Sequence, residues 1–571
     1  MEAKKRKADS EINSPSQSLA LRSRIASTRK VARPRRDDDE QLSSFARDKN
    51  AMYNYFLQLL HTKYASIVDG DYNQSQIPFA LALLQRDLKP ITSAFNPEPG
   101  DVFLSGSNDS CQLGMMTECN LLKPLKNINH NFKVVQSVAA PVANFLLTND
   151  GRLFSFGCGD MGSLGRLLED DESEQKVAEI TQFHPSKEAT VKVSRSSEDG
   201  SIIQVAAGST HRLVLTINGC VYMFGCYMDG ESQQFREMPP PDVPDDDNER
   251  SQHYRGAAPR GHREYPRHLY QMPQKVQRVY AGGSMSVVKL ADNTIMTWGI
   301  DACGELGQDN SEEDCKVFAK LKEAKENKKD EDLTVSEREK FKEQEANCIE
   351  VIKKKFMLPL RVVYDPPLGK HVVLDVACGG NHMLAVVSEI GNQRSVVYGT
   401  GLNQYGQLGL GHTNNVRKLT KLPESVNRDI SQVAAGLFHS VFLDIWGERI
   451  WTCGRVDYGA LGINDKNKPG DLETHMQLVS FDEDDRDEDL TFSSISAGEH
   501  QTFAVTKTGK LYSWGYGDTG ALGHGRDEDE LRPTAVKEFY GKNKLGRVTQ
   551  ASGGSQHVVV LAKKDQRPTE F

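Results

Sequence analysis

Residues 433–462, VAAGLFHSVFLDIWGERIWTCGRVDYGALG, form one recognisable unit. The unit opens with AAG, has a histidine three residues after that glycine, and continues with the apolar run SVFLD. After a turn at Trp446-Gly447 it resumes with RIWTCG and ends in YGALG. Short strand-like runs separated by glycine turns predict an antiparallel sheet of short strands.

Copies of this unit recur along the chain at intervals of roughly 50 residues. Residues 376–409 and 495–523 repeat it closely, and residues 205–230 and 279–307 keep most of it. A β-rich unit repeated at this interval is typical of a β-propeller, in which each blade is one small sheet packed on its neighbours.

The two ends of the repeat region each hold half a unit. It opens at Gly100 with DVFLSGSNDSCQLG, the second half, and residues 548–562, VTQASGGSQHVVVLA, supply the first half. One blade shared between these ends would remove the two open sheet edges of a ring. Counting this composite blade, the sequence predicts an all-β, seven-bladed propeller over residues 99–565, with a tail at 566–571.

Several residue types recur at fixed places in the unit and have structural explanations. The leucine of the GxLG motif should fill the core, and the aromatic residue before the central glycine should pack between blades, as at Phe156, Phe224, Trp298, Tyr398 and Trp514. Recurring histidines are expected to bond to backbone inside the blades: His211, His382, His439, His500 and His557. A catalytic histidine would be needed only once.

The N-terminal 40 residues are rich in charge and poor in apolar side chains, which predicts a disordered arm. Residues 1–36 hold 11 Lys or Arg and three acidic residues, a net charge of +8. Because the whole chain has a net charge of −9, the other residues together carry about −17. The cluster Lys4, Lys5, Arg6 and Lys7 resembles a nuclear-localisation signal. A second cluster suits phosphate neutralisation on nucleic acid: Arg22, Arg24, Arg29, Lys30, Arg33, Arg35 and Arg36. A merely solubilising tail is the alternative.

Three further segments interrupt or precede the repeats. Residues 41–98 show helical spacing of apolar residues and predict a small helical extension that docks on the propeller or on a partner. Residues 226–274 predict a long exposed loop on blade three. Residues 311–357 predict helices, with a capping box at Thr334 and Glu337. The helical stripe in that segment comprises Phe341, Cys348, Ile349, Ile352 and Phe356.

The sequence favours a binding protein over an enzyme. It has no Walker loop, HExxH, GxSxG or Cys/His metal spacing, so no catalytic residue, cofactor or metal is expected. The 10 cysteines lack regular spacing and are expected to be free thiols. No apolar run is long enough to cross a bilayer, and no membrane association is expected.

The repeats resemble the regulator of chromosome condensation family, whose members are seven-bladed exchange factors for the small GTPase Ran on chromatin. The resemblance covers about residues 100–564. It rests on the seven blades with a shared terminal blade, the basic arm, GRVDYGALG in blade six, and GRDEDELRP after the last GxLG. It implies a nuclear protein that promotes GDP release and GTP loading, supporting nucleocytoplasmic transport and mitosis. The implied partners are Ran, histones and DNA, and an import receptor that binds the arm.

The resemblance also assigns residues to the GTPase-binding face. They are Asp109, the β-wedge Tyr227, Met228, Asp229, Gly230 and Glu231, and His439 and His557. Met228 stands where the family has an arginine, and Ser209 and Met285 stand where it has aspartates. The arginine-containing histone-contacting loop before blade five reads DPPLGK at 365–370, so chromatin contact would rest on the arm. A propeller scaffold that binds without promoting exchange is the alternative function.

Overall fold

The computed structural model describes residues 99–114, 118–125, 133–168, 172–181, 183, 201–228, 234–235, 263–269, 272–328, 333–389, 394–423, 429–463, 471–481, 490–539 and 545–564. Clustering of contacts divides the chain into Met1–Tyr53 and Asn54–Phe571, and the described residues belong to the second unit. The predicted arm, helical extension and tail lie outside the described residues, as do both basic clusters.

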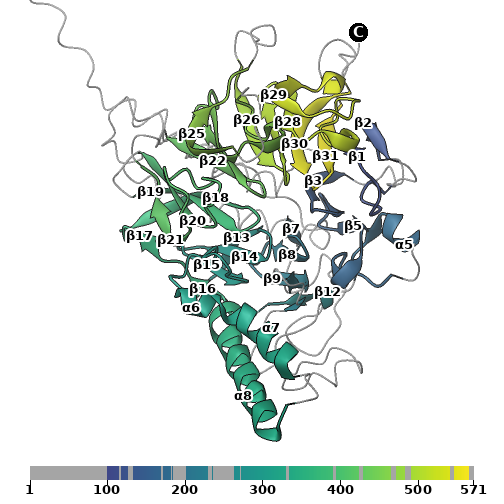
Figure 1. Ribbon diagram of the computed structural model, residues 1–571. Helices are drawn as coiled ribbons and strands as arrows, with labels where there is room; N and C mark the ends of the chain where they lie inside the picture. The colour runs from purple at the N-terminus through teal and green to yellow at the C-terminus, as the bar shows by residue number, and fades with distance from the viewer. Residues whose placement is uncertain are drawn as a thin grey trace, which may run out of the picture. The chain divides into compact units, whose positions relative to one another are not determined.

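The described strands form seven sheets of four or five strands and one two-stranded pair, which confirms the seven-bladed propeller (Figure 1). Blade one is β30 (Arg547–Gly553), β31 (His557–Lys563), β1 (Asp101–Gly106) and β2 (Cys119–Pro124). Blade two is β3 (Val134–Ala139), β4 (Ala143–Thr148), β5 (Leu153–Gly157) and β6 (Ala178–Glu179). Blade three is β7 (Ile202–Ala207), β8 (His211–Thr216), β9 (Val221–Gly225) and β12 (Arg263–His268).

The other four blades follow the same order. Blade four is β13 (Val276–Ala281), β14 (Met285–Leu290), β15 (Ile295–Gly299) and β16 (Leu360–Arg361). Blade five is β18 (His371–Cys378), β19 (His382–Glu389), β20 (Ser395–Gly401) and β21 (Val416–Lys421), with β17 (Tyr364–Asp365) at its edge. Blade six is β22 (Ile430–Ala435), β23 (His439–Asp444), β24 (Ile450–Arg455) and β25 (Leu472–Leu478). Blade seven is β26 (Phe492–Ala497), β27 (Gln501–Thr506), β28 (Leu511–Gly515) and β29 (Glu530–Ala535).

Blade one closes the ring as the sequence predicts. β1 pairs antiparallel with β31 in an unbroken register from Asp101 opposite Ala562 to Gly106 opposite His557. Gly106 has φ +128°, and a Cβ there would lie 2.4 Å from Cα of His557, so only glycine fits where the two halves meet. Segments more than 400 residues apart therefore share one sheet, and no unpaired edge remains between them.

The first strands of the blades are neighbours around the ring, joined by side chains rather than by a backbone ladder. Gln136 in β3 accepts from the backbone N–H of Val205 at 3.0 Å and donates to its carbonyl at 3.0 Å. Gln204 in β7 makes the same pair of bonds to Val279 in β13, at 3.2 and 2.8 Å. These amides satisfy backbone groups that a sheet edge would leave unpaired.

The GxLG motif and the aromatic position belong to one inter-blade contact. Gly462 of blade six lies against the ring of Trp514 of blade seven, and a Cβ there would be 2.7 Å from the indole nitrogen. The same nitrogen donates to the carbonyl of Ala460 at 3.0 Å. Phe156 and Phe224 lie in the same way against Gly114 and Gly165 of the preceding blades, which confirms at these three positions that the aromatic side chain packs between blades. Trp298 and Tyr398 are also buried.

The segment predicted to be helical, 311–357, forms α6 (Glu312–Cys315), α7 (Val317–Lys328), α8 (Val335–Val351) and the π-helical turn η4 (Ile352–Phe356). The capping box at Thr334 and Glu337 is present. Figure 1 shows α7 and α8 lying side by side and projecting from the part of the ring that carries β15 and β16. The stripe residues Cys348, Ile352 and Phe356 are buried in the hydrophobic core that includes blade four.

The segment predicted as a long loop, 226–274, is interrupted by regular structure. Its residues Arg263–His268 form β12, the fourth strand of blade three, and β10 (Tyr227–Met228) pairs with β11 (Gln234–Phe235). The predicted boundary at 274 was therefore wrong. The irregular charge pattern of this stretch hid a strand that has no alternating apolar residues.

The sequence also led to expectations about cysteines, metal ligands and membrane-spanning helices. All ten cysteines are free thiols, as expected. Within the described ranges, no group of three or more His, Cys, Asp or Glu side chains is placed to hold a metal ion. Among the described helices, none combines the length and the apolar character needed to span a membrane.

Candidate functional site

Two sets of loops meet on one side of the ring because antiparallel strands reverse direction at each turn. One set joins the first and second strands of each blade, and the other joins the third strand to the fourth. We call this side the loop face. The backbone N–H of Ser107, in the second set, donates to the carbonyl of Gln556, in the first set, at 2.8 Å. The loops of both sets therefore build one continuous surface.

Asp109 is exposed on this face, on the loop of blade one that was predicted to contact a GTPase. Its loop is fixed by two side chains on either side of it. Asn108 Oδ1 accepts from the backbone N–H of Leu113 at 2.8 Å, and Gln112 Oε1 accepts from that of Ser110 at 2.7 Å. Among the described residues, the hydroxyl of Ser107 is the one side chain that donates a hydrogen bond to the Asp109 carboxylate, at 3.2 Å. Because Asp109 is exposed, its carboxylate is open to solvent.

The recurring histidines have a structural role, but their bonds run between blades rather than inside them. Four of the five, His211, His382, His439 and His557, each lie at the start of a second strand and are buried. The bonds join His211 Nε2 to Met285 O (3.1 Å), His382 Nε2 to Ser440 Oγ (3.0 Å), His439 Nε2 to Thr502 Oγ1 (3.0 Å) and His557 Nε2 to Asn144 Oδ1 (3.0 Å). Three of the four partners are side chains of the next blade.

The histidine also explains the glycine three residues before it. A Cβ on Gly436 would lie 2.2 Å from Cε1 of His439, so the imidazole ring requires a glycine at that place. In blade seven this position belongs to Gln501 and not to His500, because Gln501 Oε1 lies 2.3 Å from a Cβ built on Gly498. The expectation that His500 belongs to the row was wrong by one residue.

Burial decides what His439 and His557 can do. It lowers the pKa of each to about 3, so both rings are neutral at neutral pH and already bonded to the next blade. They lie beneath the loop face, and their expected contact with a GTPase is corrected to a structural role. Their position in the sequence places both histidines near the loop face, but it does not show whether their side chains are exposed on that face or buried beneath it.

We expect His382→Ala to lower the free energy of unfolding by about 2 kcal/mol, because it removes a buried hydrogen bond and leaves a small cavity. His382→Gln should retain most of the stability, since the chain itself uses glutamine at this position in blade seven. Thermal unfolding of the two variants checks this. An unchanged stability of His382→Ala would show that the inter-blade bond contributes nothing.

Two residues of the expected β-wedge are described, and neither is exposed. Tyr227 is fully buried, with its hydroxyl 2.8 Å from Ser286 Oγ. Met228 is half-buried, and its backbone N–H and carbonyl both bond to Ser284 Oγ, at 3.2 and 2.6 Å. The other wedge residues, Asp229, Gly230 and Glu231, lie outside the described residues. Tyr227 therefore anchors the start of this segment rather than contacting a partner.

Of the two positions where the family was expected to have aspartates, one is internal. Met285 is fully buried at the place that histidine takes in other blades, and its carbonyl accepts from His211. Ser209 is half-buried on the loop face, and its backbone N–H donates to the carbonyl of Gly283 at 3.0 Å. The residue at position 285 is therefore part of the contact between blades three and four, whereas the residue at position 209 lies at the border of the loop face.

A row of aromatic rings on the loop face was not predicted from the sequence. We call it the aromatic patch: Tyr405, Phe438, Tyr458, His500 and Tyr516, contributed by blades five, six and seven. Centroid separations between neighbouring rings are 4.9 Å (Tyr405–Phe438), 6.3 Å (Phe438–His500), 5.4 Å (His500–Tyr458) and 5.1 Å (Tyr458–Tyr516). The rings come from loops of two kinds, so no single motif contains the patch.

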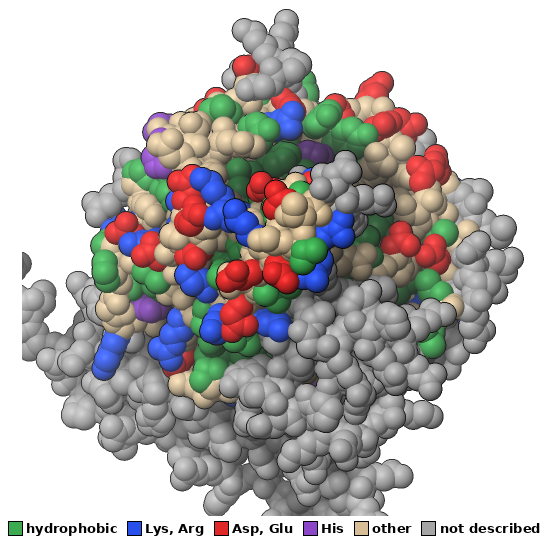
Figure 2. Space-filling model, turned by 60° about the horizontal axis from the view of Figure 1, so that its bottom comes forward, with side chains coloured by type: hydrophobic (Ala, Val, Ile, Leu, Met, Phe, Trp, Pro, Cys, Tyr) green, Lys and Arg blue, Asp and Glu red, His purple; other side chains and the backbone are tan. Residues whose placement is uncertain are grey.

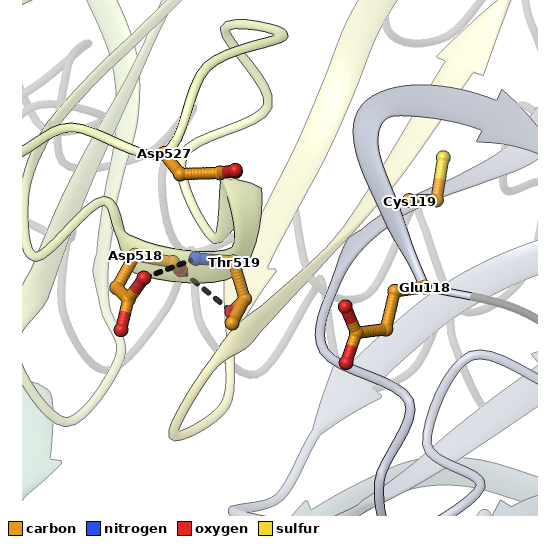
Figure 3. Close-up of a pocket in the computed structure, with 5 residues that line it drawn as sticks. All are labelled: Glu118, Cys119, Asp518, Thr519 and Asp527. Atoms are coloured by element: carbon orange, nitrogen blue, oxygen red, sulfur yellow. Dashed lines mark hydrogen bonds between the residues drawn. The ribbon is translucent and has the colours of Figure 1, made fainter.

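An acidic pocket adjoins the patch where blade seven meets blade one. Figure 3 shows Glu118 and Cys119 on one wall and Asp518, Thr519 and Asp527 on the other. Asp518 Oδ1 accepts from the backbone N–H of Thr519 at 3.0 Å, and its Oδ2 accepts from the hydroxyl of Tyr516 at 3.0 Å. The carboxylates and the adjacent rings form a surface suited to a basic partner.

Comparison with known proteins agrees with this architecture. The family model described as the RCC1-like domain matches residues 101–560. The regulator of chromosome condensation from Homo sapiens is 27% identical over 480 residues, which cover 82% of this chain and 92% of that protein. The guanine nucleotide exchange factor SRM1 from Saccharomyces cerevisiae is 27% identical over 483 residues, covering 77% of this chain and 83% of that protein.

Solved structures support the fold. The structure of Prp20p from Saccharomyces cerevisiae, described with its binding to Gsp1p and histones, has a TM-score of 0.60 and 20% identity, covering 82% of this chain and 92% of that chain. Human WBSCR16 has a TM-score of 0.58 and 18% identity, covering 82% of this chain and 100% of that chain. From its seven blades, its shared terminal blade and the match over residues 101–560, the chain belongs to the RCC1-like domain family.

Proposed function

We propose that this protein is a guanine-nucleotide exchange factor for the small GTPase Ran and that its loop face holds the GTPase. The observation that carries the proposal is the extent of the likeness to the human regulator, which spans 82% of this chain and 92% of that protein. SRM1, named as a guanine nucleotide exchange factor, matches 77% of this chain. The exposed carboxylates of Asp109, Asp518 and Asp527 add a surface that attracts basic side chains.

Exchange on this face would need no bond-making chemistry, so the protein would not be an enzyme in that sense. A GTPase holds its nucleotide through a phosphate-binding loop and Mg²⁺. A partner that binds the nucleotide-free form more tightly must weaken nucleotide binding by the same factor, because the two equilibria are linked. Carboxylates of the loop face that pair with the phosphate-binding lysine would favour that form. GTP would then enter in proportion to its concentration.

The test is release of a fluorescent guanine nucleotide from purified Ran by catalytic amounts of this protein. We expect release to accelerate with protein concentration and to proceed with either GDP or GTP in excess. A chelator of Mg²⁺ provides the full-release control for each batch of Ran. A release rate that equals the spontaneous rate at all concentrations would leave the scaffold function standing instead.

We expect Asp109→Asn to lower the kcat/KM for exchange by about 10-fold or more, because it removes charge-assisted contacts of about 1.5–3 kcal/mol. The substitution keeps the shape of an exposed side chain, so the thermal midpoint should not change. Asp292→Asn is the matched control, since Asp292 is exposed in the turn between β14 and β15 on the other side of the ring. If both variants exchange at the wild-type rate, Asp109 is not part of the site.

We also propose that the basic arm anchors the protein to chromatin and carries the nuclear-localisation signal. The family likeness supports nuclear partners, since the Prp20p structure is described with its binding to histones. On the side that Figure 2 shows, Lys and Arg side chains of the described part lie among Asp and Glu rather than in one basic area. Residues 1–36 hold 11 basic and only three acidic residues, a net charge of +8, whereas the Lys and Arg of residues 320–355 are balanced by a similar number of acidic residues.

Deleting residues 1–36 should weaken nucleosome binding by about 100-fold at low salt and flatten its salt dependence, because fewer counterions are released. Exchange on free Ran should change less than twofold. Binding is measured by titration at several salt concentrations. A charge-neutralised arm, with Arg and Lys replaced by Gln, separates charge from length. An unchanged salt slope would show that the anchor lies elsewhere.

A nuclear scaffold or adaptor without exchange activity is the second candidate. The observation that favours it is the start of the wedge segment, where Tyr227 is buried and Met228 replaces the expected arginine. A scaffold would bind Ran regardless of its nucleotide and leave the release rate unchanged. The nucleotide-release experiment therefore separates the two functions.

A further inference from the structure

The two ends of the aromatic patch differ in one respect. At the blade-five end, the guanidinium of Arg455 lies over Tyr405 and Phe438, 5.2 and 5.7 Å from the ring centroids. The same guanidinium forms an ion pair with Asp457. This end is therefore a complete cation–π site, made of two rings, a cation and a carboxylate.

The blade-seven end has the rings and the carboxylate without the cation. The rings of Tyr458 and Tyr516 lie 5.1 Å apart at an interplanar angle of 77°, and His500 lies 5.4 Å from Tyr458. The carboxylate of Asp518 accepts from the Tyr516 hydroxyl at 3.0 Å. In the part of the chain that the structure describes, no Lys or Arg lies over Tyr458 or Tyr516. The open end is bordered by the acidic pocket, whose carboxylates attract positive charge.

The backbone holds Tyr458 on the surface at a cost. Tyr458 has φ +61° and ψ 6°, a left-handed conformation that bulky residues rarely adopt. The residues at the same place in blades two and seven, Met161 and Thr519, have φ +58° and +57°. Tyr458 is 40% exposed, so its ring is not retained to fill the core. Residues in such conformations cluster at binding sites, where the surrounding structure holds them.

We propose that Tyr458, Tyr516 and Asp518 bind an arginine or lysine side chain on the surface of the partner GTPase. The inference rests on the proposed function for the identity of the partner and deepens it by naming the contact. The cation would lie over the two tyrosine rings and pair with the carboxylate, as Arg455 does with its own rings at the other end of the patch. Charge complementarity selects this occupant, because a negatively charged or purely apolar partner would meet the carboxylates of Glu118, Asp518 and Asp527 unpaired.

The test uses Tyr458→Gly, which removes the ring while placing the residue that best tolerates a positive φ. The variant should be at least as stable as the wild type, and its kcat/KM for nucleotide release from Ran should fall about 5- to 30-fold through a higher KM. Tyr458→Phe keeps the ring and should stay within twofold. Asn293→Gly relieves a left-handed backbone conformation, φ +68°, in the turn between β14 and β15 on the other side of the ring, and it should leave exchange unchanged.

The outcomes separate this inference from the proposed function. If wild-type protein does not accelerate release at all, the proposed function fails before any variant is compared. If the wild type is active and folded Tyr458→Gly matches it within twofold, the cation site is wrong while the exchange function stands. If Tyr458→Phe loses as much as Tyr458→Gly, the hydroxyl rather than the ring makes the contact, and the cation–π site is also overturned. Asp518→Asn should repeat the loss and reduce the salt dependence of KM.

Discussion

Removal of residues 547–571 is expected to abolish cooperative folding of the propeller. These residues include β30 and β31, the two inner strands of blade one, and Val558, Val559, Val560 and Leu561 are all buried there. Each such side chain contributes about 1.5–3 kcal/mol by burial, so together they match the net stability of a typical domain, about 5–15 kcal/mol. The loss also breaks the bond from His557 to Asn144, which joins blade one to blade two.

Near-ultraviolet circular dichroism and thermal unfolding measure this effect. The matched control removes only residues 565–571, which lie beyond β31. The control should unfold at the wild-type temperature, whereas the longer deletion should show no cooperative transition. A cooperative transition in the longer deletion would mean that six blades are stable without the closing strands.

Replacing Glu305 with glutamine should stabilise the protein by on the order of 3 kcal/mol at pH 8.5 and by little at pH 4.5. Burial and, after it, the neighbouring Asp301 raise the pKa of Glu305 from 4.5 to about 7. The folded protein therefore keeps this proton up to about pH 7, whereas the unfolded chain releases it near pH 4.5. The contribution to stability is full below pH 4.5 and is lost as the pH rises through 7.

The loops of other blades supply the control for this prediction. Gln112 and Gln407 occupy the place of Glu305, and all three accept from a backbone N–H two residues earlier, at 2.7, 3.1 and 2.6 Å. Gln407→Glu should therefore introduce in blade five the pH dependence that Glu305→Gln removes from blade four. Thermal midpoints from pH 4.5 to 8.5 measure both. Parallel curves for wild type and Glu305→Gln would show that the carboxyl is not the group that titrates.

The repetitive part of the fold could be predicted from the sequence because each blade repeats the same contacts between residues at fixed spacing. The glycine before His439, the leucine of GxLG and the aromatic at Trp514 all serve contacts that recur, so their spacing carries the information. The capping box at Thr334 is equally local. Half-units at both ends were enough to predict the shared blade.

The candidate site could be predicted only in part, because it depends on depth and on contacts between loops. Position in the repeat did not distinguish exposed Asp109 from the buried rings of His439 and His557. The aromatic patch joins residues from three blades, and one of its rings depends on a backbone conformation at Tyr458 that no residue pattern indicates. Tyr227 was expected on an exposed wedge, but its hydroxyl is hydrogen-bonded to the buried Ser286 side chain in the interior of the propeller.

The shared blade also sets the order in which this protein becomes competent during synthesis. One wall of the acidic pocket, at Glu118, leaves the ribosome about 400 residues before the other wall, at Asp518 and Asp527. β1 then waits for its partner β31, which follows it by more than 400 residues. A nascent or prematurely terminated chain therefore has no complete loop face with which to engage a partner. Closure of the ring therefore makes the assembled loop face depend on synthesis of β31.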